Sequence, residues 1–166
     1  MLKPGHLFHT DHDHERCVRT ALERAEQLCR ERGARLTPIR RRVLELLWSS
    51  HQPIGAYELL ERLKQHGPAA PPTVYRALDF LLELGLAHRV ATLNAFVGCC
   101  QPDRPHQGQF LICRSCRRLD ELPDAGQVNA SIEAASKAAG FLAEERTVEI
   151  FGLCASCRED CHDGKA

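Results

Sequence analysis

Residues 110–116 read Phe-Leu-Ile-Cys-Arg-Ser-Cys, and residues 151–157 read Phe-Gly-Leu-Cys-Ala-Ser-Cys. Each stretch is an apolar run that ends in a Cys-x-x-Cys pair. Two such pairs supply four thiolates, and a cage of four thiolates is typical of tetrahedral zinc. Because four protein ligands leave no open position for water, we expect a structural zinc site and not a catalytic one. The predicted ligands are Cys113, Cys116, Cys154 and Cys157.

The residues between the two pairs account for their long separation. Strands are expected at 110–112, 119–122 and 147–153, and a helix at about 126–139. If all four thiols bind one ion, the two Cys-bearing strands must end at the same edge of a sheet and therefore run parallel. The helix between them provides the crossover that parallel strands require. We therefore expect a small α/β domain over residues 101–160, followed by a tail over 161–166.

The first half of the chain predicts a separate domain over residues 15–93. Its apolar residues recur at helical spacing in four segments, and two extended runs follow. The expected helices are 15–32, one from Pro38 after an N-cap at Thr37, 56–65 with Tyr57, Leu60 and Leu63 on its apolar face, and 72–84. The extended runs, 86–90 and 94–99, flank a short connection. Short helices closed by a hairpin are typical of a winged helix, so the expected fold class is α+β.

A winged helix suggests binding to double-stranded DNA. One helix of such folds enters the major groove, and its exposed N-terminal residues contact base edges. Here that helix is 72–84, and the candidate residues are Thr73, Tyr75 and Arg76. Arg40 and Tyr57 are candidates for phosphate contacts. Residues 15–90 carry a net charge of +4 and residues 91–166 one of −3, which favours a polyanion on the first half. A helical bundle with a solvated basic face and a protein-binding winged helix stay open as alternatives.

Composition indicates a cytoplasmic protein without a membrane partner. No apolar run is long enough to span a bilayer, and the polar, His-rich residues 1–14 lack the apolar centre of a signal peptide. We expect residues 1–14 to be a disordered tail. In a reducing compartment the nine cysteines are better explained as metal ligands or core residues than as disulfides, and their odd number fits a disulfide framework poorly.

A second, looser set of possible ligands lies between the two halves. His88 belongs to the first extended run, Cys99 and Cys100 end the second, His106 lies in the connection and Glu121 follows the first Cys pair. These residues have no regular spacing. By themselves they indicate only ordinary surface or core side chains.

Taken together, these residues resemble the ferric uptake regulator superfamily of metal-sensing dimeric repressors. The resemblance covers nearly all of residues 16–158. It rests on Arg35-Leu36-Thr37-Pro38, on Pro72-Thr73-Val74-Tyr75-Arg76-Ala77-Leu78 and on the two Cys pairs. Within the superfamily the chain most resembles the zinc uptake regulator branch. Iron-sensing members carry several His residues before the first Cys pair, where residues 105–110 here hold one. Zinc-sensing members have a Cys at the end of the wing, where Cys99 lies.

The resemblance implies a regulatory zinc site formed by His88, Cys99, His106 and Glu121, and hence two Zn²⁺ per chain. The Cys99-Cys100 doublet leaves open which thiol binds, and the loop to His106 is one residue shorter than the family pattern. The resemblance also implies a homodimer built on residues 101–160, with a hinge at 94–100. Zinc would lock this dimer in the form that represses zinc-uptake genes at AT-rich palindromic operators.

Two other functions are weighed against this one. A regulator of the same fold could sense nickel, iron or peroxide, although the single His argues against iron and the ligand Cys against manganese. A zinc-dependent enzyme could use His88, Cys99 and His106 as ligands and Glu121 as a base. The chain has neither a His-Glu-x-x-His motif nor the deaminase signature, so we expect no enzyme.

Overall fold

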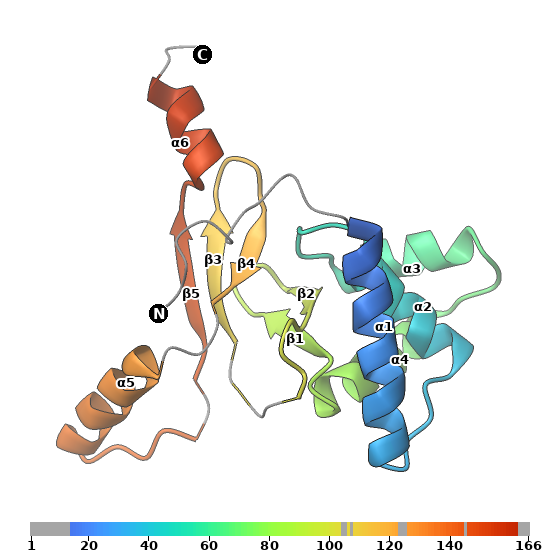
Figure 1. Cartoon of the computed structure of the whole chain (residues 1–166), viewed down its shortest axis with the longest axis horizontal. Coiled ribbons are helices and arrows are strands. Elements are labelled where there is room, and N and C mark those ends of the chain that lie inside the picture. The colour runs from blue at the N-terminus through green and yellow to red at the C-terminus, as the bar shows by residue number, and fades with distance from the viewer. Residues whose placement is uncertain (1–13, 104–105, 107, 123–125, 145, 163–166) are drawn as a thin grey trace.

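The computed structural model describes residues 14–103, 106, 108–122, 126–144 and 146–162. Four helices lead into a two-stranded sheet, and a three-stranded sheet with two more helices follows (Figure 1). The helices are α1 (His14–Glu31), α2 (Pro38–Leu47), α3 (Ala56–Lys64), α4 (Pro71–Glu83), α5 (Gln127–Ala138) and α6 (Ala155–His162). The strands are β1 (Ala87–Val90), β2 (Ala95–Gly98), β3 (Gln109–Cys113), β4 (Leu119–Glu121) and β5 (Val148–Gly152). The α+β class is therefore confirmed.

Helices α1–α4 pack around one large apolar core. It is formed by the buried stripes that helical spacing predicts, and it extends through Leu86, Ala87 and Phe96 into the two-stranded sheet. Helix α3 is the exception, because it buries Leu59, Leu60 and Leu63 while Tyr57 is 82% exposed. At 3.6 residues per turn, Tyr57 lies about 110° from the centre of that buried arc. The expectation that Tyr57 shares the apolar face was wrong.

The two sheets have the predicted pairing. Strands β1 and β2 form an antiparallel hairpin, the wing, with Val90 opposite Ala95. In the other sheet β3 pairs with β4 antiparallel and with β5 parallel. Cys113 lies opposite Gly152 in the parallel pair, so both Cys pairs follow at the same edge. The parallel arrangement expected from the four thiols is confirmed.

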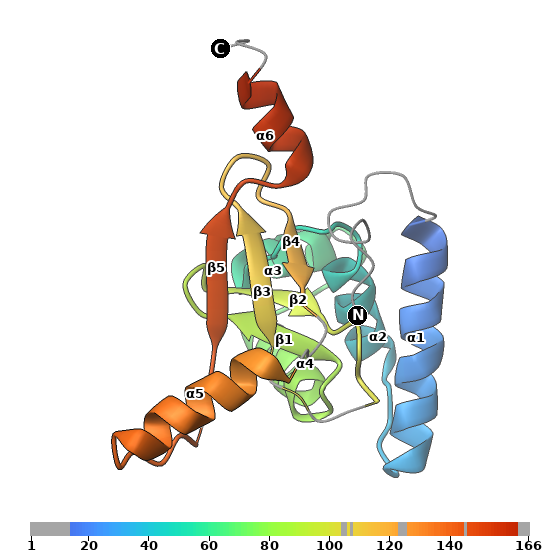
Figure 2. The same ribbon diagram turned by 60° about the vertical axis from the view of Figure 1, so that its left-hand side comes forward.

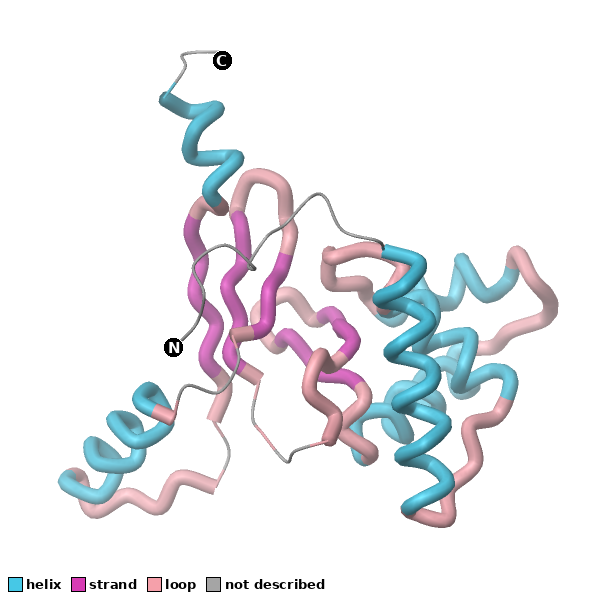
Figure 3. The backbone as a smooth tube through the Cα atoms, viewed as in Figure 1, coloured by secondary structure: helices cyan, strands magenta, loops and turns pink. Residues whose placement is uncertain are grey.

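A second, smaller core joins the wing to the three-stranded sheet. It contains Val90 and Val97 from the wing and Phe110, Ile112 and Leu119 from β3 and β4. Figures 2 and 3 show the two sheets lying together, with α5 and α6 at opposite ends of the three-stranded sheet. In Figure 3, α1–α4 lie on one side of the two sheets. The two halves of the chain therefore meet along the wing.

The connecting segment and the two ends of the chain differ in part from what the sequence predicts. The expected hinge at 94–100 contains β2, so the connecting segment starts only after Gly98. Helix α6 was not expected and occupies the first residues of the predicted tail 161–166. The predicted tail over residues 1–14 lies outside the described residues, apart from His14 at the start of α1. None of the described helices is long and apolar enough to cross a membrane.

Candidate metal centres

The four cysteines of the two Cys-x-x-Cys pairs form one cluster. Their sulfur atoms all lie within 4.8 Å of one another. Cys113 and Cys154 are buried, and Cys116 and Cys157 are partly exposed. Sγ of Cys116 lies 3.8 Å from Sγ of Cys154. Four sulfurs this close have the composition and compactness of a tetrahedral Cys₄ zinc site.

Backbone hydrogen bonds shape each pair around the cluster. The first pair lies in a tight turn in which the Arg117 N–H donates to the Cys113 carbonyl over 3.0 Å. Helix α6 begins directly after Cys154, so Cys157 lies in its first turn, where the helix dipole stabilises negative charge. The N–H of Cys154 points at Sγ of Cys113 over 3.4 Å. Although burial opposes ionisation, such backbone donors lower the pKa of Cys113 to about 6, so this thiol is prepared to bind a cation as thiolate.

The second cluster brings together His88, Cys99, His106 and Glu121. One ligand atom from each residue lies within 4.8 Å of the other three. His88 comes from β1, Cys99 follows β2 and Glu121 ends β4, so the wing and the three-stranded sheet both contribute. The side chain of Glu121 is 5% exposed, and those of His88 and His106 are 14% and 9% exposed. This is a nearly closed pocket of mixed nitrogen, sulfur and oxygen ligands.

Glu121 is the centre of this second cluster. Its Oε1 lies 2.8 Å from Nε2 of His88 and 2.6 Å from Nε2 of His106. Both ring nitrogens therefore point at the same carboxylate oxygen, as the ligands of one ion would. Burial would raise the pKa of Glu121, but the contact with His88 and the N–H of Cys100 outweigh it and lower the pKa to about 2. Glu121 is therefore an anion.

The two neighbouring thiols occupy different positions. Sγ of Cys99 lies 3.6 Å from Nε2 of His106, inside the cluster. Sγ of Cys100 instead contacts the other carboxylate oxygen, Oε2 of Glu121, at 3.1 Å. Burial, and then the charge of Glu121, raise the pKa of Cys99 to about 12, so its thiolate requires a nearby cation. A ligand set of two imidazoles, one thiolate and one carboxylate fits Zn²⁺.

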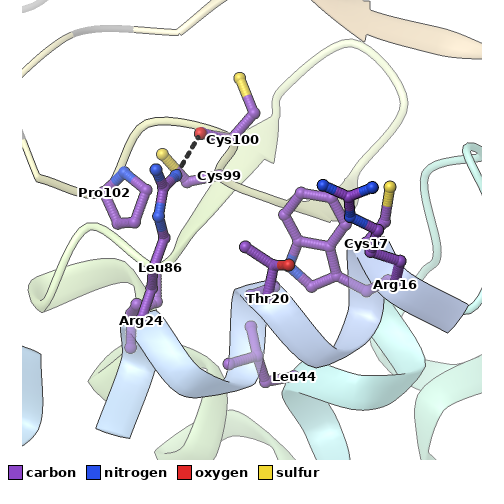
Figure 4. Close-up of a pocket in the computed structure, with 11 residues that line it drawn as sticks. Arg16, Cys17, Thr20, Arg24, Leu44, Leu86, Cys99, Cys100 and Pro102 are labelled. Carbon is purple, nitrogen blue, oxygen red and sulfur yellow. Dashed lines mark hydrogen bonds between the residues drawn. The ribbon is translucent and has the colours of Figure 1, made fainter. Parts of the chain in front are cut away.

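The segment that carries these thiols lines a cavity of about 520 Å³ (Figure 4). Residues of α1, together with Leu44 and Trp48, line the cavity as well. At its rim, Nη1 of Arg24 donates to the Cys100 carbonyl over 3.4 Å. On the opposite side Gly98 lies against the indole of Trp48, and a Cβ at Gly98 would stand 2.1 Å from Trp48 Nε1. The close approach of the Gly98 backbone to Trp48 thus fixes the end of β2, one residue before Cys99.

Gly98→Ala should therefore weaken both the fold and the second metal cluster. The indole must move, and overpacking of this kind costs about 1–3 kcal/mol of unfolding free energy. Because Cys99 is the next residue, zinc affinity at the cluster should fall as well. Thermal unfolding and competitive zinc titration measure the two effects. Gly152→Ala is the matched control, since Gly152 also ends a strand and an added Cβ meets no atom within 4 Å. If Gly98→Ala and Gly152→Ala lost equal amounts of stability and zinc affinity, this role of the Trp48 contact would be contradicted.

The predicted DNA-contacting residues lie on α2, α3 and α4. On α4 Tyr75 is 51% exposed, Arg76 is exposed and Thr73 is partly buried. Tyr57 projects from the start of α3. Arg40 is more constrained, because its guanidinium stacks 3.5 Å above the ring of Phe80 and donates to the Arg35 carbonyl over 2.8 Å. A DNA phosphate bound by Arg40 would therefore have to be accommodated beside the contacts of this guanidinium with Phe80 and Arg35.

All eight candidate ligands thus fall into two groups of four. Sequence reasoning missed three side-chain contacts that join the two halves: from Arg24 to the segment after β2, from Gln52 to the Cys116 carbonyl and from Glu149 to the wing. Each is a single side chain reaching a distant part of the chain. No periodicity or motif marks such residues in a sequence.

Comparison with known proteins identifies the family. The Ferric uptake regulator family model matches residues 31–151. The chain is 42% identical to the Zinc uptake regulation protein of Escherichia coli (strain K12) over 140 residues, covering 83% of this chain and 81% of that protein. It is 34% identical to the Zinc uptake regulation protein of Mycobacterium tuberculosis (strain H37Rv) over 129 residues, covering 76% and 96%.

Solved structures agree with this match. A zinc uptake regulator complexed with zinc and DNA superposes with a TM-score of 0.81 at 39% identity, covering 87% of this chain and 97% of the other. Holo XcZur superposes with a TM-score of 0.77 at 45% identity, covering 84% and 98%. Apo XcZur, at 43% identity and covering 85% and 97%, reaches only 0.50. The chain belongs to the ferric uptake regulator family.

Proposed function

We propose that this protein is a zinc-responsive transcriptional repressor in which a regulatory zinc locks a homodimer into its DNA-binding form. The observation that carries the proposal is the cluster of His88, Cys99, His106 and Glu121. Its ligands come from the wing on one side and from β4 on the other, so one ion bound there fixes the angle between the two halves. Zinc fits the ligand set, and relatives named as zinc uptake regulators support the choice of metal.

The comparison with holo and apo XcZur supports a conformational switch. This chain, with both clusters assembled, superposes far better on the holo form than on the apo form, although the two identities are nearly equal. Without zinc at the second cluster, the halves would adopt other angles and few molecules would be competent to bind DNA. If about 1% were competent, DNA affinity would be about a hundredfold weaker, or ~2.7 kcal/mol.

DNA contacts are assigned to one face of the helical half. We propose that Thr73, Tyr75 and Arg76 at the start of α4 contact bases in the major groove, with Arg76 suited to read guanine. Tyr57 and Arg40 would contact phosphates. Two such faces in a symmetric dimer require a palindromic operator, which we expect to be AT-rich and to lie at zinc-uptake genes, as the family resemblance implies. A protein that binds such operators would act in the cytoplasm.

Exposed apolar residues of the C-terminal half support the homodimer. Helix α5 has no buried residue in the single chain, and β5 is an edge strand. Large apolar side chains nearby are exposed, among them Phe141 at 67%, Leu142 at 80% and Ile150 at 48%. A second copy of the same surface would bury them and cover the strand edge.

A zinc titration tests the function. We expect two zinc ions per chain, a dimer in solution and DNA binding that strengthens about a hundredfold as the second ion binds. Elemental analysis, analytical ultracentrifugation and a gel shift at buffered free zinc measure these quantities. One zinc per chain with zinc-independent DNA binding would overturn the proposal. A stronger response to nickel or iron would instead favour a same-fold regulator of another metal. Four protein ligands leave no open position for the zinc-enzyme alternative.

A further inference from the structure

We propose that Glu149 is a positioning residue that holds the wing in the DNA-binding arrangement without touching either metal. The inference rests on the proposed function, because it concerns how that arrangement is stabilised. Glu149 belongs to β5, yet its carboxylate reaches the turn of the wing, which lies in the other half of the chain.

Two consecutive backbone N–H groups converge on this carboxylate. The Ala91 N–H donates to Oε1 over 2.7 Å, and the Thr92 N–H is shared between Oε1 at 3.4 Å and Oε2 at 3.3 Å. Successive N–H groups in a turn form a concavity that suits an anion, and bonds to a carboxylate are stronger than neutral ones. Asn94, in the left-handed conformation with φ 47°, shapes the turn and accepts a bond from Arg89 over 3.1 Å.

Both partners of this contact are connected to the second cluster, that of His88, Cys99, His106 and Glu121. Glu149 pairs in register with Phe110 of β3. Phe110 is fully buried, and its ring meets that of His88 edge-on with centroids 5.6 Å apart. His88 lies on β1, three residues before Ala91. The carboxylate of Glu149 on β5 and the metal cluster, through Glu121 on β4, therefore hold the same hairpin against the same three-stranded sheet at two separate points.

Glu149 differs from the other contacts between the halves. The amide of Gln52 donates to the carbonyl of Cys116, a candidate zinc ligand, and the Leu119 N–H donates to the His51 carbonyl. Arg24 contacts the segment that carries Cys99 and Cys100. Substitution of Gln52 or Arg24 would disturb a segment that carries candidate metal ligands. The bond between Leu119 and His51 joins two backbone groups, so a side-chain substitution does not remove it. Glu149 alone among these residues offers a charged contact that can be removed with both ligand sets untouched.

The effect on zinc sensing follows from linkage. If Glu149 favours the closed arrangement, zinc needs to supply less of the closing free energy, and the protein responds at lower zinc. Glu149→Gln keeps one amide oxygen that can accept from these solvent-exposed N–H groups but removes the charge and the second acceptor, so it should change the closing equilibrium only about fivefold. The largest change is expected near the midpoint of the zinc response. At saturating zinc, where nearly all molecules are closed, the change in DNA affinity should be smaller.

The test is the zinc response of Glu149→Gln. We expect the free zinc concentration at half-maximal DNA binding to rise about fivefold, with two zinc ions per chain retained. The sign is diagnostic, because removing a negative charge would by itself strengthen DNA binding. Glu83→Gln, which removes an exposed carboxylate from α4, is the charge-matched control and should show no rise in the midpoint.

The outcomes separate this proposal from the proposed function. Wild-type protein without zinc-dependent DNA binding would contradict the function itself. A wild type that responds to zinc, beside a Glu149→Gln midpoint that is unchanged or lower, would overturn the role of Glu149 alone. A lower melting temperature without a midpoint shift would reduce Glu149 to a residue of general stability, which also overturns it. Small-angle scattering of protein with only the Cys₄ site filled gives a second measure, since Glu149→Gln should be more extended than wild type.

Discussion

Cys113→Ser should leave a protein whose C-terminal half no longer folds and which no longer forms a stable dimer. The helical half has a large apolar core of its own, whereas the described residues of the C-terminal half contribute only Phe110, Ile112 and Leu119 to the small core that they share with the wing. So small a core needs a metal to hold it together. Structural zinc contributes about 10–16 kcal/mol to the folding of small domains, which is as large as the whole ~5–15 kcal/mol stability of a typical protein. Loss of one thiolate removes much of that contribution.

Circular dichroism, zinc content and sedimentation measure this effect. The variant should keep helical signal from α1–α4, lose the dimer and bind less than one zinc per chain at the Cys₄ cluster. Cys29→Ser is a suitable control, since Cys29 is also buried but lies in the helical core away from both clusters. It should lose at most about 1–3 kcal/mol of stability and keep its zinc. If Cys113→Ser stayed a folded dimer with only blunted zinc sensing, the structural role of this cluster would be disproved.

Cys99→Ser should give the opposite result: a folded dimer whose DNA affinity no longer responds to zinc. Sulfur is the softest ligand of the second cluster, and a serine hydroxyl is a poor replacement at neutral pH. The expected loss is the full zinc-dependent gain, about a hundredfold in DNA affinity at a zinc concentration that saturates wild type. A gel shift at buffered zinc measures it, and unchanged melting would show that the Cys₄ cluster is intact.

Cys100→Ser is the informative partner of this variant. Its thiol contacts the outer oxygen of Glu121 and lies outside the group of four, so zinc sensing should survive with only a modest shift. The reverse pattern, with sensing lost in Cys100→Ser and kept in Cys99→Ser, would transfer the ligand role to Cys100. Sensing that persists in both variants would rule out this thiol pair as the regulatory ligand.

The sequence predicted those parts of the fold that depend on local pattern or on a single geometric requirement. The four helices and the wing follow from apolar spacing. The parallel pairing of β3 with β5 follows because one ion must hold both Cys pairs. Helix α6 was missed because its residues are polar and lack an apolar stripe. Tyr57 was misplaced because it lies in the first turn of a helix whose buried arc is centred elsewhere.

The second metal cluster could not be predicted from spacing alone. His88 and Glu121 become neighbours only when the wing packs on the three-stranded sheet, and no local pattern encodes that packing. Resemblance to a family supplied these residues, and the structure brings them within reach of one ion. The contact of Glu149 with the wing had neither source, since one carboxylate on a strand looks like any solvent-facing residue.

The small core of the C-terminal half affects how such a sensor operates when zinc is scarce. A repressor that reports zinc scarcity must stay folded through it, so under the proposed division of roles the Cys₄ cluster would keep its zinc at concentrations that empty the cluster of His88, Cys99, His106 and Glu121. The Cys₄ cluster is suited to this, because soft thiolate ligands favour zinc and two of its four cysteines are buried. The lowest zinc concentration that such a repressor can report is then the one at which the Cys₄ cluster loses its zinc and the C-terminal half unfolds. Below that zinc concentration the repressor itself would be lost, and the genes that it controls would remain expressed.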